Sequence, residues 1–298
     1  QFVGMGKDLY ETSALAKELF EKANDILGYR ITDIMFNGTD EDLRQTKVTQ
    51  PAVFLHSVIS ALCMGDDFKP EMTAGHSLGE FSALVAAGAL SFEDGLKLVY
   101  ARAMAMQKAC EATPSTMAAI IALPDEKVEE ICASVTTEGE VCVPANYNCP
   151  GQIVISGKKE AVETACEKLK EAGAKRAIML NVSGPFHSRM LTGAGEKLGE
   201  VLEQVEIHPL SIPYVANVTA EYVTDAADVK PLLMKQVSSS VRWEQSVRAM
   251  LADGVDTFIE IGPGKTLAGF MKKIDRTVKV LNIEKLEDVD KVVEELRC

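Results

Sequence analysis

The sequence predicts an α/β protein that consists of a parallel-sheet core and a smaller ferredoxin-like subdomain inserted into it. At both ends of the chain, short β-rich runs alternate with helical patterns of about 10–15 residues, which is typical of a parallel sheet covered by helices. The middle of the chain instead gives the order β-α-β-β-α-β, which defines a ferredoxin-like unit. The length of 298 residues suits about two such units.

The two ends of the chain supply the elements of the core. Helical periodicity begins at Ser13 and recurs over residues 50–63 and 91–110, where the segment starting at residue 91 opens with a capping-box-like pattern. Apolar, β-rich runs predict the core strands at 72–74, 212–216, 257–261 and 278–283. We therefore assign residues 1–114 and 183–298 to one discontinuous core domain.

The middle segment has a different pattern. It predicts strands at 117–123, 141–146, 152–156 and 176–180, and helices at 125–133 and 158–172. The dipeptide Pro150-Gly151 marks the turn between the second and third strands. Residues 115–182 are therefore predicted to form the ferredoxin-like subdomain.

Composition and charge exclude several classes of function. The formal net charge is −13, so the overall field repels nucleic acids and anionic membrane surfaces, and we expect neither as a partner. No stretch approaches the roughly 18 uninterrupted apolar residues of a membrane span. The first residues have neither the basic nor the apolar region of a signal peptide.

The cysteines and histidines argue against disulfide and metal chemistry. Seven cysteines are scattered along the chain without a Cys-x-x-Cys motif, which indicates reduced thiols in a cytoplasmic protein. The four histidines form no cluster at metal-ligand spacing. We therefore expect no metal and no cofactor.

The segment Gly75-His76-Ser77-Leu78-Gly79 is the strongest chemical signal in the sequence. It matches the G-x-S-x-G nucleophile elbow, with a short strand before it and a helix after it, and its glycines allow a strained turn. The backbone N–H of Leu78, at the helix N-terminus, would face a developing oxyanion. The motif therefore predicts a hydrolase-like parallel-sheet core with Ser77 as its nucleophile. A glycine-rich turn with an incidental serine is the structural alternative.

His187 is the best candidate for the base that activates Ser77. It lies in an irregular segment after a predicted strand, where catalytic groups are often displayed, and the order Ser then His agrees with hydrolase-type α/β folds. His76 is adjacent to Ser77, so its side chain should point away from the hydroxyl. His56 and His208 fit plain structural roles better. No acidic third member is evident, and a backbone carbonyl could orient the imidazole instead.

Arg102 lies among apolar and small residues of a predicted helix. A buried guanidinium costs several kcal/mol unless it is paired. Its partner is either an internal carboxylate, which would make it a structural residue, or the carboxylate of a substrate held by two parallel hydrogen bonds. The sequence leaves both interpretations open.

Motifs along essentially the whole chain resemble those of the malonyl-CoA:acyl carrier protein transacylase family, which includes the acyltransferase domains of polyketide and fatty acid synthases. The similarity covers, in order, Gln1–Gly6, Thr49–Ala52, Gly75–Glu80, Arg102 with Met106 and Gln107, Asn148–Gln152, Pro185–Ser188, Asn217–Val218 and Gly262–Gly264. This set of motifs in this order is specific to the family.

The resemblance implies a role for each matching residue. Ser77 resembles the acylated nucleophile, His187 its base, and Arg102 the clamp on the free carboxylate of the malonyl group. Gln236 corresponds to the residue whose backbone carbonyl holds the histidine, and Phe186 is similar to the malonyl-selective pattern. The other substrate-binding residues that the matching motifs imply are Gln50, His76 and Asn148.

The N-terminus departs from the family pattern. The family begins with an apolar strand and Gly-Gln-Gly-Ser-Gln, and the first Gln of this motif supplies the second oxyanion N–H. Gln1 matches the second Gln. We therefore expect the printed sequence to be incomplete at this end.

The favoured function is transfer of a malonyl group from malonyl-CoA to the phosphopantetheine thiol of acyl carrier protein, through a malonyl-serine, in fatty acid or polyketide elongation. Such carrier proteins are acidic, so a local basic patch should receive them, unless its residues are simply the solvated ends of helices. The candidates for this patch are Arg189, Lys272, Lys273 and Arg276. One rival is a serine esterase or thioesterase, which does not explain Arg102, and another is a catalytically silent docking protein.

Overall fold

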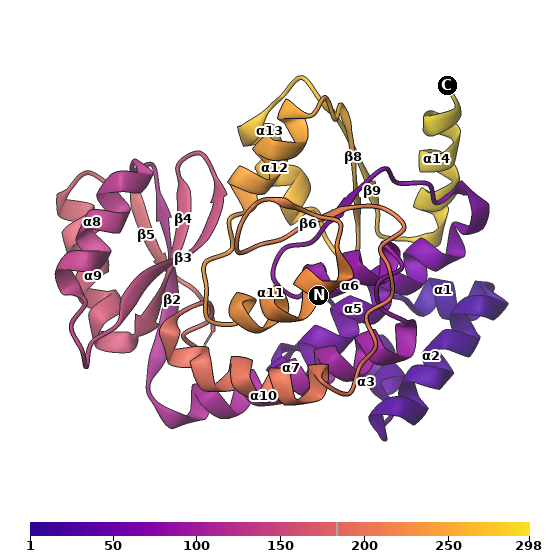
Figure 1. Ribbon diagram of the computed structural model, residues 1–298, viewed down its shortest axis with the longest axis horizontal. Coiled ribbons are helices and arrows are strands. Elements are labelled where there is room, and N and C mark those ends of the chain that lie inside the picture. The colour runs from indigo at the N-terminus through magenta and orange to yellow at the C-terminus, as the bar shows by residue number, and fades with distance from the viewer. Residues whose placement is uncertain (183) are drawn as a thin grey trace.

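A computed structural model describes residues 1–182 and 184–298 of the chain. The molecule has two parts (Figure 1): a larger, helix-rich core at the right and a sheet covered by two helices at the left. The helices and strands of residues 7–112 and 189–297 lie in the core. Those of residues 115–179 form the smaller part, so the predicted insertion is visible in the arrangement of the chain.

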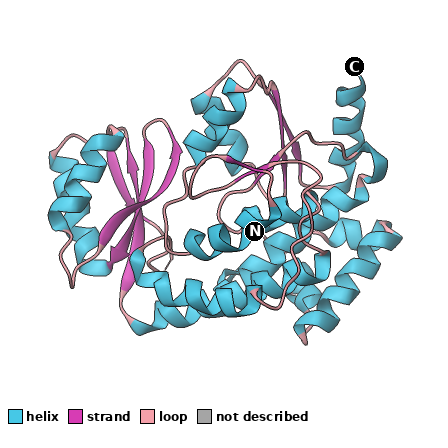
Figure 2. Cartoon of the chain, in the orientation of Figure 1, coloured by secondary structure: helices cyan, strands magenta, loops and turns pink. Residues whose placement is uncertain are grey.

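Helices dominate the core (Figure 2). Ser13 caps the second helix by accepting a hydrogen bond from the Ala16 amide, and Ser91 caps the longest helix in the same way. The core helices are α1 (Lys7–Thr12), α2 (Ala14–Leu27), α3 (Ile31–Asn37), α4 (Asp40–Arg44), α5 (Thr46–Cys63), α6 (Gly79–Ala86), α7 (Phe92–Ala112), α10 (Thr192–Leu202), α11 (Val229–Gln236), α12 (Trp243–Ala252), α13 (Thr266–Ile274) and α14 (Leu286–Arg297).

The core strands form two short sheets within the described residues. Strands β1 (Thr73–Ala74), β6 (Tyr214–Val215) and β7 (Tyr222–Val223) lie in the order β1-β6-β7, and β8 (Thr257–Ile261) pairs with β9 (Lys279–Ile283). The pairs β1–β6 and β8–β9 are parallel, as predicted, whereas β7 is antiparallel to β6. Strand β6 is shorter than the predicted 212–216, because Pro213 directly before it has no N–H with which to extend the ladder.

The smaller part has the predicted ferredoxin-like order. Its elements are β2 (Ser115–Ile121), α8 (Asp125–Val135), β3 (Cys142–Cys149), β4 (Gln152–Lys158), α9 (Lys159–Glu171) and β5 (Arg176–Met179). The sheet order is β3-β4-β2-β5 with antiparallel pairs throughout, and α8 and α9 pack together beside it (Figure 1). The domain limits 114/115 and 182/183 stay predictions, and Ser183 lies outside the described residues.

The two parts of the molecule meet along β3. The Tyr147 amide of β3 donates a hydrogen bond of 2.9 Å to the Val241 carbonyl, and helices α12 and α13 of the core pack against the same strand. One residue further along β3, Asn148 contacts His76 in the turn between β1 and α6. The junction of the two parts therefore lies beside the predicted nucleophile elbow.

Candidate active site

Ser77 occupies a tight turn between β1 and α6. Its φ angle is 53°, in the left-handed region that a residue with a side chain adopts only when its surroundings enforce it. A Cβ atom on Gly75 would overlap the Gly79 carbonyl, so the turn requires glycine at position 75. A Cβ atom on Gly79 would meet nothing within 4 Å. Of the two elbow glycines, only Gly75 is thus required sterically, because it alone lies at the close approach of the two chain segments.

His187 lies within hydrogen-bond distance of Ser77. The two reacting atoms, Ser77 Oγ and His187 Nε2, are 2.8 Å apart, although the residues are 110 positions apart in the chain. The Nδ1–H of His187 donates to the backbone carbonyls of Gln236 at 2.9 Å and Ser239 at 3.1 Å. Gln236 is the last residue of α11, where helix carbonyls lack partners within the helix. Nε2 is therefore left to accept the hydroxyl proton.

Burial keeps the imidazole of His187 neutral. The side chain is 3% exposed, and burial, supported by the positive charge of Arg102, lowers the pKa of His187 to about 3. The two carbonyl hydrogen bonds act in the opposite direction. At neutral pH the imidazole can accordingly accept a proton from Ser77.

Arg102 reaches the site from the middle of α7 and is 1% exposed. Its Nη1 donates to Gln50 Oε1 at 2.7 Å, and its Nη2 donates to Gln236 Oε1 at 2.9 Å and to Ser77 Oγ at 3.0 Å. All three acceptors are neutral, and among the described residues no carboxylate pairs with this guanidinium. Burial lowers the pKa of Arg102 to about 10, which leaves it charged at neutral pH.

Asn217, just after β6, holds the elbow from the other side. Its Oδ1 accepts a hydrogen bond of 2.8 Å from the Ser77 amide, and its Nδ2 donates to the Gly75 carbonyl at 2.7 Å. The Leu78 amide donates no hydrogen bond in the described part of the chain, so it is available to an oxygen atom bound at Ser77. Asn217 belongs to one of the family motifs, but nothing local in the sequence indicates its contact with Ser77, 140 residues away.

The chain is similar to known proteins over nearly its whole length. The profile of the acyl transferase domain family matches residues 1–293. The chain belongs to this acyltransferase family. It is 45% identical over 298 residues to the malonyl CoA-acyl carrier protein transacylase of Bacillus subtilis strain 168, covering 100% of this chain and 94% of the relative.

Solved structures of acyltransferases are similar over nearly the whole length. An acyl carrier protein S-malonyltransferase from Vibrio cholerae has a TM-score of 0.94 and 42% identity, covering 98% of this chain and 96% of the other. A malonyl-transacylase in complex with its type II PKS acyl-carrier protein has a TM-score of 0.95 and 36% identity, with coverage of 99% and 96%. The fold class predicted from the sequence is thereby confirmed.

His76 and Asn148 join the two parts of this acyltransferase. His76 Nε2 and Asn148 Oδ1 are 2.8 Å apart, so the imidazole interacts with β3 and not with the Ser77 hydroxyl. The ring also faces Trp243 and Phe270, with centroid separations of 5.6 and 6.4 Å. His76 is accordingly placed in the wall between the two parts of the molecule.

The remaining predicted site residues lie on different elements, and only some of them contact the groups around Ser77. Gln50, in α5, contacts Arg102 directly, and Phe186 is half-buried beside His187. Arg189 is exposed and donates to the Thr137 carbonyl of the smaller part at 2.9 Å. The exposed cations Lys272, Lys273 and Arg276 lie instead at the end of α13.

Within residues 1–182 and 184–298, no group of three or more His, Cys, Asp or Glu side chains could hold a metal ion. No helix in the same ranges is long and apolar enough to cross a bilayer.

Proposed function

We propose that this acyltransferase moves a malonyl group from malonyl-CoA to the phosphopantetheine thiol of acyl carrier protein. The observation that carries the proposal is Arg102, a buried guanidinium 3.0 Å from the Ser77 hydroxyl that is paired only with neutral oxygens. A carboxylate on the acyl group would supply the charge that the protein itself does not place there. The relatives reported above are malonyl transacylases, which supports the same substrate.

The first half of the proposed reaction acylates the enzyme. His187 takes the proton of Ser77 while the hydroxyl oxygen attacks the thioester carbonyl of malonyl-CoA. The Leu78 N–H donates to the tetrahedral oxyanion, and α6 adds the positive end of its dipole. The carbon–sulfur bond breaks, CoA leaves as the thiol with the proton from His187, and malonyl-Ser77 keeps its carboxylate on Arg102.

The second half transfers the malonyl group to the carrier. The phosphopantetheine thiol gives its proton to His187, and its sulfur attacks the ester carbonyl of malonyl-Ser77. When the tetrahedral intermediate collapses, the proton returns to the Ser77 oxygen and the enzyme is restored. The malonyl-carrier product would supply fatty acid or polyketide elongation, a proposal that the malonyl transacylase relatives support. The seven free cysteines support a location in the cytoplasm.

Labelled malonyl-CoA separates the proposed transferase from its two rivals. Purified protein is incubated with radiolabelled malonyl-CoA, and the Ser77 peptide is analysed by mass spectrometry. A stable malonyl-serine that is discharged by carrier protein is the expected result. Rapid release of free malonate would indicate a hydrolase, and absence of label would indicate a silent docking protein.

Two substitutions test the roles proposed for the nucleophile and its base. Ser77→Ala should reduce the rate of malonyl transfer by roughly 10⁶-fold, as removal of a catalytic serine does in other enzymes. His187→Ala should be nearly as damaging, and the double variant little worse than either single one, because the pair acts as a unit. Additive losses, or more than a few per cent of activity in Ser77→Ala, would reject the assignment.

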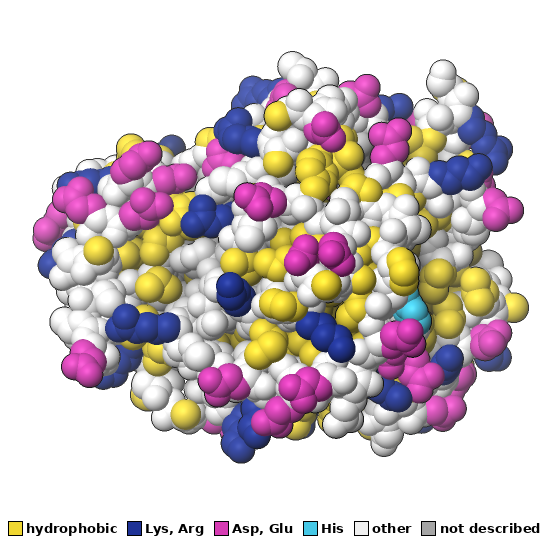
Figure 3. All heavy atoms as spheres, in the orientation of Figure 1, with side chains coloured by type: hydrophobic (Ala, Val, Ile, Leu, Met, Phe, Trp, Pro, Cys, Tyr) yellow, Lys and Arg dark blue, Asp and Glu magenta, His cyan; other side chains and the backbone are white. Residues whose placement is uncertain are grey.

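The proposed docking site for the acidic carrier is a local basic patch. The face in Figure 3 carries interspersed acidic and basic side chains around a hydrophobic middle, so no broad positive field covers it. Phe270 of α13 faces His76, which places the α13 cations Lys272 and Lys273 on an element that borders the site. Their charge reversal should raise KM for the carrier and leave acylation by malonyl-CoA unchanged. An unaltered KM at low salt would reject these two lysines.

A further inference from the structure

Glu80 is a buried acidic side chain for which the proposed reaction has no use. It follows Ser77 by three residues, in the first turn of α6, and its exposed fraction is 0%. Its Oε2 accepts a hydrogen bond of 2.8 Å from Gln236 Nε2, and its Oε1 has no partner among the described residues. Burial of a carboxylate is costly unless its charge is compensated, so this position requires a physical explanation.

The side chain of Gln236 connects Glu80 to Arg102. Besides Glu80, its Nε2 faces the Ser77 carbonyl oxygen at 2.7 Å and Asn217 Oδ1 at 3.3 Å. Because all three neighbours are acceptors, the amide cannot be reversed without losing these bonds. Its Oε1 is therefore turned to Arg102, from which it accepts a hydrogen bond of 2.9 Å. The guanidinium and the carboxylate are thus held at opposite ends of one amide.

A neutral spacer between these two charges suits a site that must bind and release a carboxylate in each turnover. A carboxylate in direct contact with Arg102 would occupy the N–H groups that the proposed substrate needs, through strong charge-assisted hydrogen bonds. Behind the Gln236 amide, Glu80 can offset the buried positive charge without occupying those N–H groups. The acceptors that the substrate must displace are then neutral and bind more weakly.

We propose that Glu80 is a positioning residue that acts as the resident counter-charge of Arg102 and thereby sets the selectivity for acyl groups that carry a carboxylate. The inference rests on the proposed role of Arg102 as the clamp. When Glu80 is ionised, it offsets the field of Arg102 and weakens the attraction for a substrate carboxylate. When Glu80 is protonated, that attraction is stronger.

The surroundings of Glu80 place its change of charge near neutral pH. Burial raises the pKa of Glu80 to about 7, against the hydrogen bond from Gln236 and the charge of Arg102. Of the elements around it, α7 contributes Arg102 and β6 contributes Tyr214, whereas α11 and the segment after β6 contribute the neutral Gln236 and Asn217. Burial raises the pKa of Tyr214 well above its ordinary range.

The histidines of the site change charge at lower pH than Glu80. Burial lowers the pKa of His187 to about 3 and holds that of His76 below its ordinary value. The guanidinium of Arg102, whose pKa is about 10, stays charged. From about pH 6 to about pH 8.5, Glu80 is accordingly the group around Arg102 whose ionisation changes most.

The ratio of kcat/KM for malonyl-CoA to kcat/KM for acetyl-CoA is the measurement that isolates this effect. Both substrates use Ser77, His187 and the same CoA portion, so their common pH dependence cancels in the ratio. In the wild-type enzyme we expect the ratio to fall by about threefold or more from pH 6 to pH 8.5, because two buried charges separated by a single amide side chain still interact at an effective dielectric constant of about 20. A ratio that does not change with pH overturns the proposal, even without a variant.

Glu80→Gln removes the charge and keeps an acceptor for the Gln236 amide. We expect the ratio for this variant to stay at its high, low-pH value up to pH 8.5. Glu21→Gln, the same change in an exposed network far along the chain, is the matched control and should follow the wild type. If Glu80→Gln lowers kcat/KM for both substrates equally and keeps the wild-type pH dependence of the ratio, Glu80 is only structural and the proposal is wrong.

Arg102→Ala separates failure of this inference from failure of the proposed function. If the clamp is correct, the malonyl preference collapses in Arg102→Ala and no longer depends on pH. If Arg102→Ala keeps the malonyl preference, the proposed clamp itself fails. If the preference collapses in Arg102→Ala but its pH dependence survives in Glu80→Gln, only the role given to Glu80 is refuted.

Discussion

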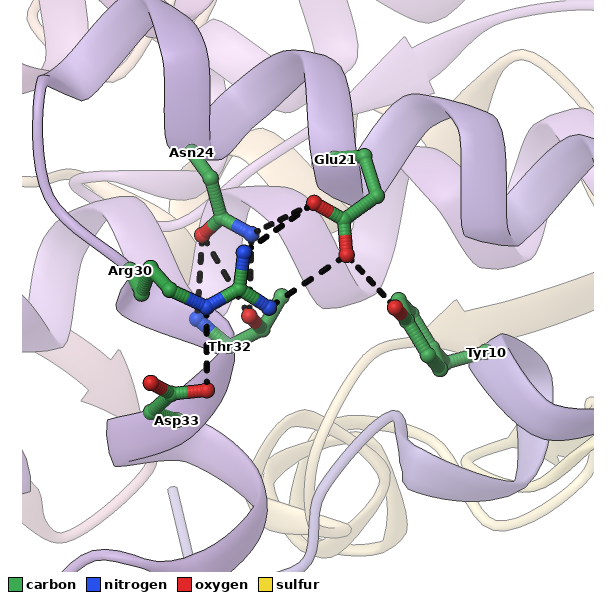
Figure 4. A network of polar contacts seen from close by, with 6 residues as sticks. All are labelled: Tyr10, Glu21, Asn24, Arg30, Thr32 and Asp33. Carbon is green, nitrogen blue, oxygen red and sulfur yellow. Dashed lines mark hydrogen bonds and ion pairs between the residues drawn. The ribbon is translucent and has the colours of Figure 1, made fainter.

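Arg30 and Arg102 are held in opposite ways in this protein. Arg30 is exposed, and its guanidinium donates to Glu21 at 3.2 and 3.4 Å and to Asp33 at 3.3 Å (Figure 4). Arg102 is buried, and its hydrogen bonds end on two amide oxygens and the Ser77 hydroxyl. The arginine with the lower desolvation cost thus has two carboxylates, whereas the one with the higher cost has none in direct contact.

This difference distinguishes a structural ion pair from a binding group. The Arg30 network fixes the packing of α1, α2 and α3: Tyr10 and Asn24 also donate to Glu21, at 2.5 and 3.4 Å. Hydrogen bonds from Arg30 and Tyr10 lower the pKa of Glu21 to about 2. A group that binds a charged ligand must instead remain unpaired until the ligand arrives, and the fold bears the cost of burying it.

Among these substitutions, Arg102→Ala should have the largest effect on activity, because it removes the buried binding group. We expect kcat/KM for malonyl-CoA to fall by about 3 kcal/mol, or more than about a hundredfold, which is the scale for loss of one partner of a buried charge pair. The value for acetyl-CoA should stay level or rise, because an acetyl group has no carboxylate to pair with the guanidinium. A parallel loss for both substrates would make Arg102 a structural residue.

Gln50→Glu would make Arg102 resemble Arg30. The substitution places a carboxylate where Gln50 Oε1 now accepts a hydrogen bond of 2.7 Å from Arg102. We expect kcat/KM for malonyl-CoA to fall about tenfold or more, because the internal carboxylate competes for the guanidinium, while acetyl transfer changes little. Thermal unfolding checks that the variant is folded. Unchanged malonyl transfer would argue against Arg102 as the binding group.

Glu21→Gln removes the main partner of Arg30 and should have the smallest effect. Because the pair is exposed, we expect the melting temperature to fall by no more than about 2 °C, less in high salt, with kcat/KM unchanged. The folded pKa of Glu21, about 2, lies below its ordinary 4.5, so its contribution is present above pH 4.5 and is lost as the pH falls toward 2. The difference between wild type and variant, followed by thermal unfolding, should shrink in that window. A large loss of stability or activity would contradict the distinction between the two arginines.

Local sequence signals account for much of the fold and for the elbow. The order of elements from β2 to β5 follows from periodicity and from the Pro150-Gly151 turn, and both are properties of neighbouring residues. The elbow is equally local, since Gly75 and Ser77 form it within a few residues. The division of the core strands into two sheets was not predicted, because strand pairing depends on contacts between segments far apart in the chain.

The sequence predicts single residues of the candidate site but not the contacts between them, because these contacts join segments far apart in the chain. His187 could be singled out because few histidines compete and because it follows a strand, and the resemblance supplied Arg102 and Gln236. The connecting contacts could not be found in this way: the Gln236 amide meets the Ser77 carbonyl across 159 residues, and Asn217 meets the Ser77 amide across 140. Glu80 directly follows the elbow motif, yet nothing in the motif indicates that this side chain is fully buried.

The residue types and their local patterns specify the groups that this protein can use: a serine on a strained turn, one histidine in an irregular segment, and an arginine in an apolar helix. These choices are chemical and local. How the charges are distributed among these groups depends on the folded arrangement of segments that are far apart in the chain. Whether Arg102 faces an internal carboxylate or neutral oxygens depends on which side chains α5, α11 and the elbow turn bring within about 3 Å of it. In a buried site that distance decides whether a charge is neutralised or left for a ligand.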